Sequence, residues 1–278
     1  MLGKLIKYEF KSTAKWFIVM YAALIIITVF NKLTITFNAN NNPLIELATV
    51  LLTMTYVLTI FSSYVVTLVL IISRFYKNMV TDEGYLSHTL PVKTINHVNS
   101  KLIVSAVWFI LSVIVMIASI MILGAGDGLM TFFNAIGDLF STAAKDGFLG
   151  KLIITLLLMF FTLIAALLYN ILTFYCAIAL GSLFNKHKLS GAVGMYFVIY
   201  FVMQIFELIF SILIFSFDID NAIANFVLGG AGELVYGFTE GINGINFMLI
   251  SSSVYSLVFA AIFYIITNVI LSKKLNLD

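Results

Sequence analysis

The sequence is short of charged residues and of cysteine, and both shortages narrow what it can encode. Only 10% of the 278 residues are charged, whereas 62% are hydrophobic. Because a typical soluble domain carries about 25% charged residues, this chain could not cover the core of a water-soluble globule. The composition predicts an all-α polytopic membrane protein. The one cysteine, Cys176, lies in an apolar run, which excludes an intramolecular disulfide and favours a packed side chain.

Patterns typical of catalysis and metal binding are also missing. Neither a phosphate-binding G-x-x-x-x-G-K-[ST] loop nor an H-E-x-x-H pair occurs, so ATP hydrolysis by that route is not expected. The three histidines, His88, His97 and His187, do not stand at metal-ligand spacing, and we expect them to be solvated in loops. We therefore predict no catalytic residue, no metal site, no cofactor in this chain and no nucleic-acid partner.

Long apolar runs predict six transmembrane helices in one membrane domain that covers residues 1–278. These spans are predicted at 16–36, 44–73, 101–123, 149–184, 191–217 and 247–271. A bilayer core is about 30 Å thick and a helix rises about 1.5 Å per residue, so the second run is longer than one crossing requires. We expect that helix to be tilted or to project beyond the membrane.

Residues 1–15 carry four lysines at helical spacing, with apolar residues on another face. These lysines are Lys4, Lys7, Lys11 and Lys15. The pattern is typical of an amphipathic helix that lies on anionic membrane lipid. An ordinary basic flank of the first span would share it, and both alternatives place the N-terminus in the cytoplasm.

Two further intervals, 124–148 and 218–246, do not read as spans, and we expect both outside the cytoplasm. In the first, apolar residues recur with a helical period over 129–140, which predicts a short helix in the membrane interface. The second holds six glycines within 229–244 and two short apolar patches. It is either a re-entrant segment packed against protein or a plain interfacial loop.

The distribution of basic residues predicts the orientation of the chain. Of the 15 Lys and Arg residues, all except Lys32, Lys145 and Lys151 fall near the termini, in the intervals 74–98 and 185–190, or, for Lys101, just after the first of these intervals. Because cytoplasmic loops are enriched in Lys and Arg, the termini and these two intervals are predicted to be cytoplasmic.

The interval 74–98 is the longest polar stretch in the first half of the chain. Thr81 can cap a helix start, Asp82 and Glu83 suit the positive end of a helix dipole, and Pro91 disfavours a helix through the preceding residue. A plain solvated loop would not need the apolar residues found here, so the pattern favours a loop that docks on a second protein. The candidate contact residues are Arg74, Tyr76, Asp82, Glu83, Gly84, Tyr85, Leu86, Leu90 and Pro91.

Glu207 is the clearest ionisable residue inside a predicted span. A charged side chain at the bilayer centre costs about 2.5–3.5 kcal/mol on insertion scales unless it is paired, neutral or facing water. Gln204 lies one turn earlier on the same face, and Asn170 and Asn268 lie in other spans. These four polar residues form an interhelical hydrogen-bond clamp, the polar wall of a pathway, or a proton-linked site at Glu207.

Four short motifs in the first part of the chain carry a family resemblance. They are Arg74-Phe75-Tyr76-Lys77-Asn78, Asp82-Glu83-Gly84-Tyr85-Leu86, Thr89-Leu90-Pro91-Val92 and Ser100-Lys101-Leu102. Together with the start of the chain, they resemble ATP-binding-cassette (ABC) transporter permeases of the type 2 exporter family from Gram-positive, clostridial or Firmicutes-like bacteria. The later part of the chain is similar by architecture only.

The resemblance implies the permease subunit of an exporter in the bacterial plasma membrane, with both termini cytoplasmic. Its 74–98 loop would carry a coupling helix for a separate ABC ATPase subunit, which would hold ATP and magnesium. A second permease subunit, identical or different, would complete the path for an amphiphilic cargo such as a peptide, a lipid or an antimicrobial drug. The alternatives are a proton-linked secondary transporter centred on Glu207 and a non-transporting immunity or sensor protein.

Overall fold

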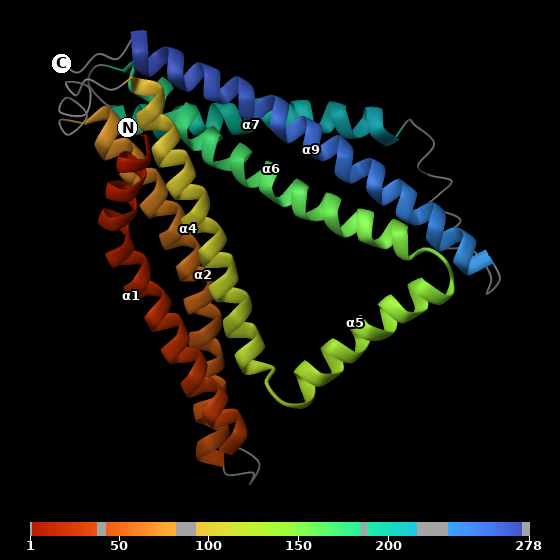
Figure 1. The fold of residues 1–278 in the computed structure, drawn as a ribbon. Coiled ribbons are helices and arrows are strands. Elements are labelled where there is room, and N and C mark those ends of the chain that lie inside the picture. The colour runs from red at the N-terminus through yellow and green to blue at the C-terminus, as the bar shows by residue number, and fades with distance from the viewer. Residues whose placement is uncertain (1, 38–42, 82–92, 185–187, 216–232, 274–278) are drawn as a thin grey trace. The chain divides into compact units, whose positions relative to one another are not determined.

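The computed structural model describes residues 2–37, 43–81, 93–184, 188–215 and 233–273. Every regular element within these residues is an α-helix, and six of the helices are long and apolar enough to cross a membrane. The chain is therefore an all-α polytopic membrane protein. The helices are α1 (Leu2–Phe37), α2 (Pro43–Val80), α4 (Thr94–Leu123), α5 (Asp127–Lys145), α6 (Leu149–Gly181), α7 (Lys188–Phe215) and α9 (Glu233–Lys273) (Figure 1).

Contacts between helices divide the chain into two compact units, Met1–Asn134 and Ala135–Asp278. In the first unit α1, α2 and α4 lie side by side, with α2 antiparallel to the other two (Figure 1). Its apolar core is centred on Trp108 of α4, whose ring stacks between Phe10 and Phe17 at centroid distances of 4.4 and 4.3 Å. The indole nitrogen donates a hydrogen bond of 2.8 Å to the Thr13 hydroxyl. Phe10, Thr13 and Phe17, which lie three to four residues apart on one face of α1, thus hold α4 against α1.

The structure corrects the expected boundary between a surface helix at 1–15 and a first span at 16–36. No helix breaker separates the two segments, and α1 runs unbroken from Leu2 to Phe37. Ile6 and Phe10 pack against the cluster of Phe17 and Trp108, so this face of the N-terminal segment contacts protein. The lysine face is exposed as the pattern predicted, at Lys4, Lys7, Lys11 and Lys15.

Helix α2 extends beyond the predicted end of the second span, as expected of a run longer than one crossing requires. Since α2 continues to Val80 and α4 begins at Thr94, Arg74 and Tyr76 belong to a helix rather than to a loop. The expectation of a solvated His97 is wrong, because His97 lies on α4 and its residue is 6% exposed.

In the second unit, α6 packs against both α9 and α7. Hydroxyl and amide groups join α6 to α9, with Thr155 2.7 Å from Asn246 and Thr162 2.7 Å from Ser253. The backbones of α6 and α7 approach closely at Gly181, where an added Cβ would lie 2.4 Å from the Ala192 backbone. Cys176 is buried in α6, as expected.

The last helix differs from the sequence prediction. The predicted span began at 247, after a glycine-rich interval that was expected to be a re-entrant segment or a loop. Residues 233–246 instead form the first turns of α9, while 218–232 fall outside the described residues. Each helical glycine costs roughly 1 kcal/mol relative to alanine, and packing outweighs that cost where Ile242 is buried beside Ala143 and Phe148.

The short helix predicted over 129–140 is confirmed and extends over Asp127–Lys145 as α5. It begins just after Gly126, whose φ of 110° favours glycine. The apolar residues Phe132, Phe133, Ile136 and Leu139 are exposed along it. This leaves an apolar face that a membrane interface would cover.

Candidate functional site

The first candidate site is a set of charged and polar side chains that we call the Glu9 cluster: Glu9, Arg74, Asn78 and Lys101. It joins all three helices of the first unit. The Glu9 carboxylate accepts hydrogen bonds from Lys101 Nζ at 2.5 Å, from Arg74 Nε at 3.3 Å and from the Asn78 amide at 3.4 Å. Arg74 also donates to the Ser12 hydroxyl.

The Glu9–Lys101 ion pair is buried, whereas the Glu9–Arg74 pair is partly exposed. The Lys101 side chain is 4% exposed and that of Glu9 15% exposed, whereas Arg74 is 36% exposed. A buried charge is costly unless it is paired and hydrogen-bonded, so the Glu9 carboxylate stabilises the buried Lys101 cation. The cluster therefore fixes α2 and α4 to α1 next to the ends that flank residues 81–93.

Sequence reasoning identified Arg74 but missed Glu9. The available signal was that Glu9 is the only acidic residue before Glu46 and stands among four lysines. Tyr76 is half-buried on α2, outside the cluster. The remaining predicted contact residues lie outside the described residues: Asp82, Glu83, Gly84, Tyr85, Leu86, Leu90 and Pro91.

The first unit carries further polar contacts along the length of its helices. The Tyr21 hydroxyl lies 2.8 Å from that of Ser112, which lies 3.1 Å from that of Thr67. Nearer the other end, Lys32 donates to the carbonyls of Leu123 at 3.0 Å and Ala125 at 2.5 Å. Such interhelical hydrogen bonds supply specific attachments where lipid removes the hydrophobic driving force between helices.

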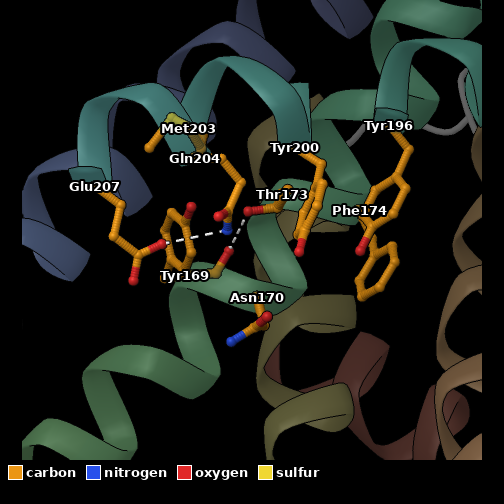
Figure 2. Close-up of a pocket in the computed structure, with 9 residues that line it drawn as sticks. All are labelled: Tyr169, Asn170, Thr173, Phe174, Tyr196, Tyr200, Met203, Gln204 and Glu207. Carbon is orange, nitrogen blue, oxygen red and sulfur yellow. Dashed lines mark hydrogen bonds between the residues drawn. The ribbon is translucent and has the colours of Figure 1, made fainter. Parts of the chain in front are cut away.

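The second candidate site, which we call the tyrosine pocket, lies between α6 and α7 in the second unit (Figure 2). Its volume is about 210 Å³. The lining residues combine aromatic rings with amide, hydroxyl and carboxylate groups: Tyr169, Asn170, Thr173, Phe174, Tyr196, Tyr200, Met203, Gln204 and Glu207.

The tyrosine pocket brings together three of the four intramembrane polar residues that the sequence singled out. Gln204 donates to Glu207 at 3.4 Å, and Asn170 reaches the same pocket from α6 (Figure 2). Asn268 is elsewhere on α9, where its amide donates to the Tyr264 carbonyl at 3.0 Å. The Glu207–Gln204 contact lies within one helix, so it is not an interhelical clamp.

The aromatic lining was missed by sequence reasoning, although its spacing was visible. Tyr196, Tyr200, Gln204 and Glu207 follow one another at intervals of four, four and three along α7, which places them on one helical face. Phe174 of α6 stacks on Tyr196 at a centroid distance of 4.9 Å. The pocket is thus built by one face of α7 and the facing residues of α6.

Fold and sites define a multi-pass membrane protein with one internal ion-pair cluster and one polar aromatic pocket among its described residues. Comparisons with protein families, with curated proteins and with solved structures found no match for this chain.

Proposed function

We propose that this chain is the membrane permease subunit of an ABC exporter, driven by a separate ATPase subunit that docks on the interval 74–98. The proposal starts from the resemblance of that interval to type 2 exporter permeases. Six spans and the bias of basic residues toward the 74–98 side are consistent with it.

The Glu9 cluster is the observation that carries the proposal. A docking loop can drive transport only if its displacement moves transmembrane helices rather than bending the chain locally. Arg74 of α2 and Lys101 of α4 flank residues 81–93, and both are held by one carboxylate on α1. A force on the loop would therefore reach three helices together.

Capture of the partner tests the proposal. The tagged chain, solubilised from its native membrane, should co-purify with an ATPase whose hydrolysis is stimulated in proteoliposomes that contain the chain. Leu86→Asp should abolish capture, because it places a charge in the predicted docking surface. Lys15→Gln is the matched control, since this exposed lysine lies outside the loop and should leave capture unchanged. Failure to capture an ATPase with the wild-type chain would refute the proposal.

A proton-linked carrier centred on Glu207 is the competing function, favoured by the position of that carboxylate in the tyrosine pocket. It predicts that Glu207→Gln abolishes cargo transport while an imposed proton gradient drives transport without ATP. An exporter of the proposed kind would require ATP under the same conditions. Transport assays in proteoliposomes with ATP or with a pH gradient separate the two functions.

A further inference from the structure

The tyrosine pocket has features of a ligand site that the proposed docking mechanism does not use. It places a carboxylate, amide and hydroxyl oxygens, and aromatic rings around one cavity (Figure 2). Glu207 is residue 20 of the 28 in α7, so it lies well inside the helix and far from either end. A charged group at this depth requires compensation, and polar residues inside membrane proteins commonly mark substrate or ion pathways.

The Glu207 carboxylate has little compensation from the protein itself. Among the residues that the structure describes, no basic side chain forms an ion pair with it, and its hydrogen bond from Gln204 is long at 3.4 Å. Glu207 is also exposed on α7 rather than enclosed by neighbouring helices. The carboxylate can therefore accept hydrogen bonds from a bound cation.

The aromatic rings of the pocket also favour a positively charged ligand. Phe174 and Tyr196 are stacked with an interplanar angle of 6°, and Tyr200 continues the row at 6.4 Å from Tyr196. On the other side of the pocket, the Tyr169 ring stands beside Glu207 (Figure 2). The negative face of an aromatic ring attracts a cation within about 6 Å, and such attraction grows when the cation leaves water. Rings and carboxylate together select against an anion.

The remaining polar groups indicate what kind of cation fits. The Asn170 amide donates to the Ala166 carbonyl at 2.8 Å, which leaves its oxygen as the acceptor for the pocket. With the Tyr200 hydroxyl and Glu207, this gives acceptors for several N–H donors. The volume of about 210 Å³ is below the roughly 300 Å³ at which sites for whole drug-sized ligands begin. The pocket can enclose a charged head group while the rest of the molecule stays in apolar surroundings.

From this geometry we infer that the tyrosine pocket binds the ammonium head of a lipophilic amine. As a site for transported cargo, the inference rests on the proposed export function, and it narrows the amphiphilic cargo to one with a primary or secondary amine. Glu207 neutralises the ammonium, and Tyr169, Tyr200 and Asn170 surround it with π faces and acceptors.

Equilibrium binding to the full chain alone tests the inference. The chain is placed in phosphatidylcholine nanodiscs and titrated with tritiated decylammonium, against empty nanodiscs. We expect saturable binding that unlabelled decylammonium displaces and that neutral decanol or anionic decanoate does not. Absence of saturable binding, or equal displacement by decanol, would overturn the inference, because the site would then recognise only the alkyl chain.

Variants assign the binding to the pocket. Glu207→Gln keeps the shape of the side chain and should weaken decylammonium binding by about tenfold or more. Tyr200→Leu removes a ring and should weaken it by about fivefold, which supplies a second measurement if the first variant folds poorly. Phe201→Leu is the matched control, because Phe201 is 68% exposed, follows Tyr200 directly and does not line the pocket. Unchanged affinity in both pocket variants would overturn the assignment.

The outcome can be separated from that of the ATPase capture. Binding of decylammonium requires no ATPase, and capture of the ATPase requires no cargo. If an ATPase is captured and decylammonium does not bind, the amine site is refuted and export stands. If decylammonium binds and no ATPase is captured, the site stands and the proposed mode of export is refuted.

Discussion

Glu9→Gln is the substitution that most directly tests how the first unit is held together. It keeps the size of the side chain and removes the charge that Lys101 and Arg74 share. Because Lys101 is buried, the loss should be measured as lower stability of the whole three-helix unit rather than as a local change at the helix end.

The magnitude follows from the burial of each partner. Removing one member of a buried ion pair costs roughly 3–5 kcal/mol, and Lys101, at 4% exposed, belongs to that class. Arg74 is 36% exposed, so its share is that of a surface pair and adds about 1 kcal/mol or less. We expect Glu9→Gln to cost about 3–6 kcal/mol, a large part of the roughly 5–15 kcal/mol that stabilises a typical protein.

A double substitution separates the ion pair from general damage. Replacing both members of a buried pair by neutral groups is often nearly neutral, so Glu9→Gln combined with Lys101→Met should cost much less than the sum of the two single changes. Lys11→Gln is the matched control on the exposed face of the same helix and should cost less than about 0.5 kcal/mol.

Tryptophan fluorescence during unfolding by SDS in mixed micelles measures these differences. The chain has two tryptophans, and Trp108 is buried in the core that the cluster adjoins. Trp16 is 65% exposed, so a Trp16→Phe background leaves Trp108 as the reporter of opening. Unfolding of Glu9→Gln at the wild-type SDS fraction, or additive costs in the double variant, would refute the reasoning.

Two further predictions concern the second unit. Gly181→Ala should destabilise the second unit by about 1–3 kcal/mol, because the new methyl group would lie 2.4 Å from the Ala192 backbone. Gly194→Ala, on the neighbouring helix, is the control. Its methyl group would meet nothing within 4 Å, so the change should be neutral or stabilising by up to about 1 kcal/mol. Equal SDS unfolding midpoints for the two variants would contradict this. Thr162→Val removes the hydrogen bond to Ser253 and should lower the stability of the second unit by about 0.6 kcal/mol, and by no more than about 1.7 kcal/mol. A larger loss in the same assay would contradict this value for a single interhelical hydrogen bond.

The spans were predictable because hydropathy is a local property, whereas the Glu9 cluster was not. Its partners stand 65, 69 and 92 residues from Glu9 in the sequence, and no spacing rule indicates which long-range neighbours a side chain meets. The same holds for Trp108, whose stacking partners belong to α1. Helical periodicity identified the lysine face of α1 but not what its opposite face contacts.

The tyrosine pocket was half predictable for a similar reason. Gln204 and Glu207 are three residues apart, so their meeting on α7 follows from helix geometry alone. Asn170 lines the same pocket because α6 packs against α7. Asn268 lies on α9 and bonds to Tyr264 of that helix instead. A polar residue in a span is visible in the sequence, but its shared site depends on which helices pack together.

Polar side chains join helices in both units, but the two candidate sites differ in how their carboxylates are paired. In the first unit, Glu9 pairs with buried Lys101, and Tyr21 reaches Ser112 across the helix interface. These groups bond to one another and hold the helices together. Such a unit would move as one body, as the proposed coupling to an ATPase requires. In the second unit, Glu207 and Gln204 are exposed on α7 and bond only weakly to each other. A carboxylate in a membrane span is costly unless it is compensated, so the weakly bonded Glu207 is consistent with the amine site that we propose in the second unit.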